Sequence, residues 1–256
     1  MTPPANQRSK RAIADSSIPP CGSSRRTRTT PDTLRYVAEA VRAAAASTDW
    51  HPRIIVQTGT VAAAREAAEL GADVIVAQGV DAGGHQFVHA AGISVHNEFP
   101  HQEIAVWAAG GIADGRGVAA ALALGAEATY MVAPESDAQD YKRQALLSAT
   151  DGAANTVKSY VHDHVQGNWT WPSLYDARAL VHPSYTDDLA GMEIKENEAR
   201  YKTAKEKGDV SMMVTWSGSG VGLIRSALPA AEITKKVRDE ALGVIEGVKA
   251  ALQQRT

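Results

Sequence analysis

The fold is decided by residues 54–77, IIVQTGTVAAAREAAELGADVIVA, and by the related run IAVWA at 104–108. The apolar runs at 54–57, 74–77 and 104–108 are short, and an Ala-rich amphipathic pattern at 61–70 separates the first two. Short apolar strands that alternate with amphipathic helices predict βα units and a parallel sheet. Ligands of such sheets bind at the carboxyl ends of the strands, so a functional site is expected there.

Length and composition fit one α/β domain. The chain has 256 residues, about what a single (β/α)8 barrel needs, and 44% of them are hydrophobic. The formal net charge of −3 gives no case for nucleic acid or a membrane surface as a partner. No apolar run approaches the roughly 18 residues of a membrane span. The single cysteine, Cys21, excludes an intrachain disulfide and fits a reducing compartment.

Residues 1–31 differ from the rest of the chain. They are basic and rich in Ser, Thr and Pro, and they carry one acid, Asp15, and no apolar periodicity. This composition predicts a disordered tail ahead of a single domain at 32–256. An Arg-rich, acid-poor start is also typical of transit peptides. The expected compartment is the cytoplasm, with mitochondrial targeting left open.

Further elements are expected along the chain. Helices are predicted at 32–46, 117–124, 137–148, 193–207 and 229–252, and strands near 127–132, 156–161 and 211–224. The stretch at 162–191 is predicted to be rich in loops. No helical pattern lies between the strands at 74–77 and 104–108, although a parallel pair needs a crossover connection.

The run AAGGIADGRG at 108–117 follows one strand and opens a helix. Paired glycines let a ligand approach the backbone, and the free N–H groups of a helix N-terminus attract anions, so the run suits a phosphate. The alternative is a tight turn that only needs positive φ. The run matches neither G-x-x-x-x-G-K-[ST] nor G-x-G-x-x-G, which argues against a Walker or Rossmann site.

A second Gly-rich run, QGVDAGGH at 78–85, carries the candidate catalytic group. Gln78 follows directly on a strand, and its amide can bond the edge of a heterocycle. Gly83 and its neighbour Gly84 allow close packing on a flat ring. His85 is expected on a loop over the strand ends, where it can take a proton near neutral pH. The alternative for His85 is a solvated or structural histidine.

Three other features are weaker signals. The run His162-Asp163-His164 would place both histidines on one face of a strand, but no third ligand is evident and no metal is predicted. Trp169 and Trp171 are interpreted as packing residues. The Gly-rich run at 216–222 is either a simple turn or a further part of the same ligand site.

Together, VIVAQGVDAGGH at 74–85 and AAGGIADGRGVAAALALGA at 108–126 resemble the nitronate monooxygenases, formerly called 2-nitropropane dioxygenases. The fungal members look most similar. PESDAQDYKRQALL at 134–147 and SGSGVGLIRSALPAAEI at 217–233 extend the resemblance, which covers roughly 54–254. The resemblance implies an FMN-dependent TIM barrel that oxidises nitronates or nitroalkanes with O2.

The resemblance also implies roles for particular residues. His85 matches the family's general base, which takes the α-proton of a nitroalkane or orients its nitronate. The glycine pair at 110–111 matches the turn at the flavin phosphate. The residues that match the family's FMN contacts are Gln78, Gly83, Gly110, Gly111, Tyr130 and Met131.

Three departures from the family pattern bear on function. The family continues after Met131 with a segment similar to G-T-R-F, which holds the phosphate, whereas this chain continues with Val132-Ala133-Pro134. The family's helix between the His85 run and the next strand has no counterpart. Nothing before residue 54 matches the family's first βα units. We therefore expect an incomplete barrel with open sheet edges, through which two copies could form a homodimer.

Two other interpretations stay open. A degenerate homologue would keep the motifs without binding flavin. The missing phosphate segment favours it, because each charge-assisted hydrogen bond contributes roughly 1.5–3 kcal/mol. The other interpretation is an FMN-dependent enoyl reductase-like enzyme. His85, with no visible nicotinamide or acyl-carrier groove, favours nitronate oxidation.

Overall fold

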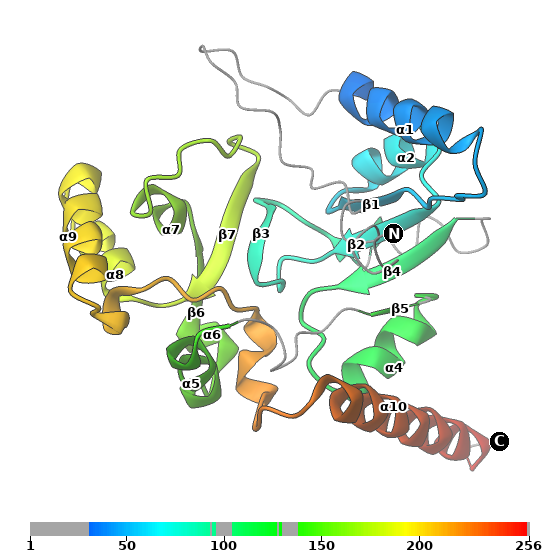
Figure 1. Cartoon of the computed structure of the whole chain (residues 1–256). Helices are drawn as coiled ribbons and strands as arrows, with labels where there is room; N and C mark the ends of the chain where they lie inside the picture. The colour runs from blue at the N-terminus through cyan, green and yellow to red at the C-terminus, as the bar shows by residue number, and fades with distance from the viewer. Residues whose placement is uncertain (1–30, 93, 96–103, 127, 130–137, 255–256) are drawn as a thin grey trace, which may run out of the picture.

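The computed structural model describes residues 31–92, 94–95, 104–126, 128–129 and 138–254, and these residues form two β-sheets. Figure 1 shows a parallel sheet with its helices in one half of the molecule and an antiparallel sheet with its helices in the other. The fold is therefore mixed α/β, as the alternation of apolar runs and helical patterns predicts. The basic tail at 1–30, predicted to be disordered, lies outside the described residues.

The first sheet is parallel and has the strand order β1-β2-β4-β5. Its strands are β1 (Ile55–Thr58), β2 (Val74–Gln78), β4 (Ala105–Ala109) and β5 (Ala128–Thr129). The register pairs Ile55 with Val74 and Val74 with Ala105, so the carboxyl ends of the strands lie at one edge. The predicted βα units and parallel sheet are confirmed.

Three helices pack around this sheet. They are α1 (Pro31–Ala45), α2 (Val61–Glu69) and α4 (Gly115–Ala123). Thr60 caps α2 by accepting a hydrogen bond from the N–H of Ala63, and Gly71, at φ +83°, follows its end. The small buried side chains Ala64 and Ala67 let α2 lie close to the strands, where it packs on Ile75.

The second sheet is antiparallel and has the strand order β3-β7-β6. Its strands are β3 (Gly84–Phe87), β6 (Thr156–Ser159) and β7 (Tyr175–Leu180). Lys158 ties the three strands together. Its ammonium group donates to the carbonyls of Phe87 and Val88, each at 2.9 Å, and lies 3.1 Å from the carboxylate of Asp176. Of these strands, only β6 was expected from the sequence.

The prediction of a loop-rich stretch at 162–191 is wrong. The stretch contains β7, the helix α8 (Pro183–Leu189) and most of the short helix α7 (Val161–His164). The buried residues of β7, Asp176, Ala177 and Ala179, have little strand propensity, so only pairing with β3 and β6 defines the strand. His162 and His164 lie on α7 and not on a strand.

The strand predicted at 211–224 is also absent from the described structure. The segment instead forms two 3-10 helices, η3 (Val210–Met212) and η4 (Ser219–Leu223), with an isolated bridge between Trp216 and Ala179. Gly218, Gly220 and Gly222 provide no side chains to pack on a sheet. This explains why the apolar run does not continue as a strand.

The remaining helices match their predicted positions. They are α5 (Asp140–Ser148), α9 (Ile194–Glu206) and α10 (Ala230–Gln253). The short helix α6 (Gly152–Asn155) was not predicted. A second core joins Val161 and Val165 to Ala179 of β7, Tyr201 of α9 and Val214. Among the described residues, no helix combines the length and apolar character that crossing a bilayer requires.

The crossing of α4 and α10 leads to a stability prediction. A Cβ on Gly115 would lie 2.3 Å from Glu240 Cβ and 2.6 Å from the Ala241 nitrogen. We expect Gly115→Ala to lower the free energy of unfolding by about 1–3 kcal/mol, because the added methyl overpacks the crossing. Gly243→Ala, on α10 with no atom within 4 Å of its Cβ, is the control. It should raise stability by about 1 kcal/mol in the same urea titration. Equal stability of Gly115→Ala and wild type would contradict the close crossing.

Candidate active site

Three Gly-rich turns meet between the two sheets, and we call them the glycine junction: residues 79–84, 110–113 and 217–220. The first two turns follow β2 and β4 at the carboxyl edge of the parallel sheet, and the third leads into η4. The run at 216–222 therefore lies beside the other two, as one interpretation of its sequence expects.

The turns of the glycine junction touch backbone to backbone. A Cβ on Gly83 would lie 2.5 Å from the Gly218 nitrogen, and one on Gly110, at φ +99°, would lie 2.8 Å from the Ala82 nitrogen. Ser219 donates from its N–H and its hydroxyl to the carbonyl and carboxylate of Asp81, at 3.0 and 2.7 Å. Only glycine permits such approaches, so these residues hold the turns together before any ligand is considered.

Gly110 and Gly111 follow β4 at the carboxyl edge of the parallel sheet. Within the described part of the chain, neither N–H has an acceptor, and Gly111 is exposed. The N-terminus of α4 differs, because Asp114 accepts from the N–H groups of Arg116 and Gly117. The side-chain hydrogen bond from Arg116 lowers the pKa of Asp114, so this cap is a carboxylate at neutral pH. The N-terminus of α4 is therefore already capped, which leaves the glycine pair as the candidate position for an anion.

His85 lies on β3 and not on the loop that the sequence predicts. Its Nε2 lies 2.8 and 2.9 Å from the two carboxylate oxygens of Asp163 on α7. A carboxylate only accepts, so Nε2 carries the hydrogen and Nδ1 of the neutral ring keeps its lone pair. Nδ1 has no hydrogen-bond partner among the described residues. The His85 side chain is 24% exposed and that of Asp163 is 7% exposed, so an oriented base borders on solvent.

Aromatic rings enclose His85. Trp171 stacks on the imidazole with ring centroids 3.9 Å apart and an interplanar angle of 14°. The ring centroid of Trp216 lies 5.1 Å from that of His85, with an interplanar angle of 52°. The interpretation of Trp171 as a packing residue is too narrow, because the residue it packs on is the candidate base.

The structure brings the candidate site residues into two groups. Gln78 is buried beside His85, and its amide donates to the His85 carbonyl at 3.2 Å. Gly83 belongs to the same segment, and Gly110 and Gly111 form the second group at the end of β4. The other two candidates, at positions 130 and 131, lie outside the described residues.

Sequence reasoning missed Asp163. The run at 162–164 was considered only for metal binding, and among the described residues no three His, Cys, Asp or Glu side chains are placed to hold a metal ion. Asp163 meets His85 because β3 pairs with β7, and α7 packs against that sheet. The only available signal was the unusual presence of a carboxylate between two histidines.

A pair of buried histidines lies next to Asp163. His162 Nδ1 lies 2.8 Å from His182 Nε2, and His162 Nε2 lies 3.1 Å from the carbonyl of Val157. A carbonyl only accepts, so the hydrogen of His162 is on Nε2, and its Nδ1 accepts from His182. Desolvation lowers the pKa of His162, and desolvation with the neighbouring His162 lowers the pKa of His182 to about 4.

These features define an α/β protein with a carboxylate-oriented histidine near a Gly-rich strand edge. A sequence profile described as nitronate monooxygenase matches residues 39–240. The chain belongs to the nitronate monooxygenase family.

Curated relatives carry the same name. The chain is 44% identical over 211 residues to a nitronate monooxygenase of Neurospora crassa, covering 77% of this chain and 56% of that protein. It is 33% identical to nitronate monooxygenase npaC of Metarhizium robertsii, covering 83% of this chain and 64% of that protein. The chain thus spans between half and two thirds of the length of these relatives.

Solved structures are similar over most of this chain. FabK from Thermotoga maritima has a TM-score of 0.66 at 25% identity, covering 85% of this chain and 68% of that one. A nitroalkane oxidase from Streptomyces ansochromogenes has a TM-score of 0.63 at 26% identity, covering 84% of this chain and 62% of that one.

The buried histidine pair predicts a pH-dependent stability. The pKa of His182 in the folded protein, about 4, lies below its unfolded value of 6.5. The contribution of His182 to the free energy of unfolding is therefore fully present above pH 6.5 and is lost as pH falls toward 4. We expect urea unfolding at about pH 5 to give a free energy about 1–2 kcal/mol lower than at about pH 7.5 because of His182 alone. His182→Gln should reduce this difference, whereas the exposed-site control His51→Gln should keep it. An unchanged difference in His182→Gln would show that other groups cause it.

Proposed function

We propose that the chain serves the FMN-dependent oxidation of nitronates and nitroalkanes with O2. The observation that supports the proposal is the geometry of His85, which the resemblance matches to the family's general base and whose Nε2 lies 2.8 and 2.9 Å from the carboxylate oxygens of Asp163. Family membership and the similarity to a nitroalkane oxidase support it. We further infer that residues 32–256 form a partial TIM-barrel domain. The parallel sheet is one arc of an incomplete (β/α)8 barrel, and the antiparallel sheet is not part of that arc.

FMN would be held mainly through its phosphate. The N–H groups of Gly110 and Gly111 at the end of β4 suit a dianion, and charge-assisted hydrogen bonds of this kind are strong. The residues assigned to the isoalloxazine ring of FMN fit it less well, because the Gln78 amide donates to the His85 carbonyl and Gly83 is covered by Gly218. When bound, the flavin would supply the redox chemistry with O2.

His85 would act as the general base toward a neutral nitroalkane. Nδ1 would take the α-proton, and the C–H electron pair would pass into the nitro group to give the nitronate. The Asp163 carboxylate would fix the plane and tautomer of the ring and compensate the charge that the ring gains. A preformed nitronate needs no such proton transfer, so His85 would only orient it.

The aromatic neighbours of His85 would shape the substrate site. Trp171 stacks on the imidazole and Trp216 is tilted against it, so part of the ring is shielded from water. A small apolar nitroalkane is compatible with such walls. We propose a small-molecule substrate on this basis, without a nucleic acid or membrane partner.

A homologue that binds no flavin is the second candidate. The engaged Gln78 amide and the covered Gly83 favour it, because the chain itself occupies two contacts that the resemblance assigns to FMN. Such a protein could still form a homodimer. Among the described strands β1 pairs only with β2, which leaves one edge of the sheet for a second copy.

Substitution of the His85–Asp163 pair tests the proposed role. His85→Asn should lower kcat for a neutral nitroalkane about 100-fold or more, the usual contribution of a general base, and should affect the preformed nitronate much less. Asp163→Asn should act in the same direction through ring orientation. Steady-state O2 consumption with nitroethane and with its nitronate measures both effects.

The matched control is Asp187→Asn, which removes a carboxylate paired with Arg200 away from His85. This variant should leave kcat unchanged for both nitroethane and its nitronate. Equal losses on nitroethane and its nitronate in His85→Asn would reject the proton-abstraction role.

A further inference from the structure

Two contacts that fix the His85 ring come from one short segment, residues 163–171. The Asp163 carboxylate accepts from Nε2 at 2.8 and 2.9 Å, and the indole of Trp171 stacks on the imidazole with ring centroids 3.9 Å apart. An imidazole N–H lies in the plane of its ring, so one contact holds the ring edge and the other holds its face. Any group that fixes the shape of the segment 163–171 therefore also fixes the orientation of the candidate base.

The end of α7 brings Asn168 back to Asp163. The N–H of Gly167, at φ +75°, donates to the His164 carbonyl at 2.9 Å. The N–H of Asn168 donates to the Asp163 carbonyl at 3.0 Å. These two bonds follow the pattern of a Schellman motif, in which glycine supplies the left-handed conformation. The chain therefore reverses at Gly167, and the Asn168 side chain lies beside the Asp163 carboxylate.

The Asn168 side chain joins the two ends of the segment. Its Oδ1 accepts from the N–H and from the hydroxyl of Thr170, at 3.2 and 2.8 Å. A backbone N–H only donates, so the amide oxygen faces Thr170 and the amide nitrogen donates to Asp163 Oδ1 at 3.4 Å. Thr170 precedes Trp171 in the chain. One side chain thus contacts the carboxylate and also shapes the turn that carries the indole.

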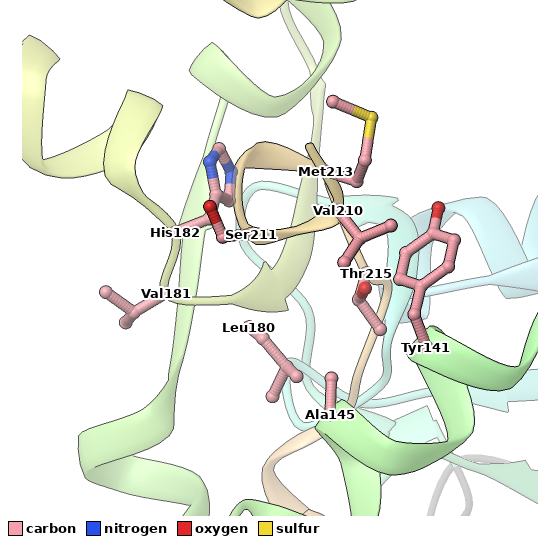
Figure 2. Close-up of a pocket in the computed structure, with 9 residues that line it drawn as sticks. All are labelled: Tyr141, Ala145, Leu180, Val181, His182, Val210, Ser211, Met213 and Thr215. Carbon is pink, nitrogen blue, oxygen red and sulfur yellow. The ribbon is translucent and has the colours of Figure 1, made fainter. Parts of the chain in front are cut away.

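The other histidine pair that involves α7 is closed to a substrate. Figure 2 shows His182 among the residues that line a pocket of about 230 Å³. Its Nδ1 is fully buried, so a molecule in the pocket cannot reach that atom, and its Nε2 lies 2.8 Å from His162 Nδ1. Of the two pairs, only His85–Asp163 borders on solvent, and this is the pair that Asn168 contacts.

We propose that Asn168 is a positioning residue for the candidate base. It holds the Asp163 carboxylate against His85 Nε2, and through the turn at Thr170 it holds Trp171 on the imidazole. Asn168 itself touches no reacting atom, and its effect is to fix the direction in which the Nδ1 lone pair of His85 points. The effect on catalysis rests on the proposed function, whereas the positioning can be measured in the protein without flavin.

Asn168→Ala removes both side-chain contacts. In the flavin-free protein we expect nuclear Overhauser effects between the ring protons of His85 and Trp171 to be lost. Long-range ¹⁵N–¹H NMR should show the neutral His85 ring in both tautomers, whereas wild type should show the Nε2–H tautomer alone. Asn168→Asp keeps the acceptor for Thr170 but loses the donor to Asp163. It should therefore keep the Overhauser effects to Trp171 and lose the single tautomer.

The matched control is Asn155→Ala. Asn155 is also half-buried, and its Oδ1 also accepts two hydrogen bonds, from the N–H groups of Thr150 and Asp151 at 3.0 and 2.9 Å. Neither bond involves His85 or Asp163, so this variant should keep the wild-type NMR signals of His85. Unchanged His85 signals in both Asn168 variants, or the same change in Asn155→Ala, would overturn the positioning role.

Turnover separates this inference from the proposed function. With FMN added, Asn168→Ala should lower kcat for nitroethane about 10- to 100-fold and kcat for the preformed nitronate much less, because only the first substrate needs an aligned base. An unchanged kcat for nitroethane in a variant that has lost the NMR contacts would also overturn the positioning role. A wild-type protein that shows the NMR contacts but no turnover would reject the proposed function and would leave the contacts of Asn168 confirmed.

Discussion

The close packing of the glycine junction is the constraint on which the arrangement of the two sheets depends. The turn from β2 to β3 is only five residues long, 79–83, and it passes directly against Gly218 and the turn after β4. A side chain at Gly83 or Gly218 would push these backbones apart. Because these backbones stay in contact, the chain leaves the parallel sheet after β2, and β3 pairs with β7. This pairing brings His85 next to Asp163.

This constraint separates what the sequence could predict from what it could not. The strands at 55–58, 74–78 and 105–109 are predictable because β-branched runs, amphipathic spacing and terminal glycines all agree. The antiparallel sheet is not, because β7 reads YDARAL and gains its stability from cross-strand partners. Local propensity carries no information about such partners.

The same distinction holds for the candidate site. Residue type and position point to His85 and to the glycine pair at 110–111, since each follows a strand in a Gly-rich run. Asp163 and Trp171 could not be found in this way, because they are 78 and 86 residues from His85 in the chain and meet it only through tertiary structure. Two hydrogen-bonded pairs, His85–Asp163 and His162–His182, each include a residue of the short helix α7, and these two residues are adjacent. The His85–Asp163 pair borders on solvent, as a candidate base requires, whereas the His162–His182 pair is buried.

The proposed function depends on whether the glycine pair holds a flavin phosphate. The direct measurement is the visible spectrum of the protein after excess FMN is added and free FMN is removed by gel filtration. We predict that wild type retains the flavin band and that Gly111→Asp loses it, because the added carboxylate repels the phosphate. Gly208→Asp, at a similar positive φ outside the site, should retain the band. A colourless wild-type protein would contradict the account and favour the homologue that binds no flavin.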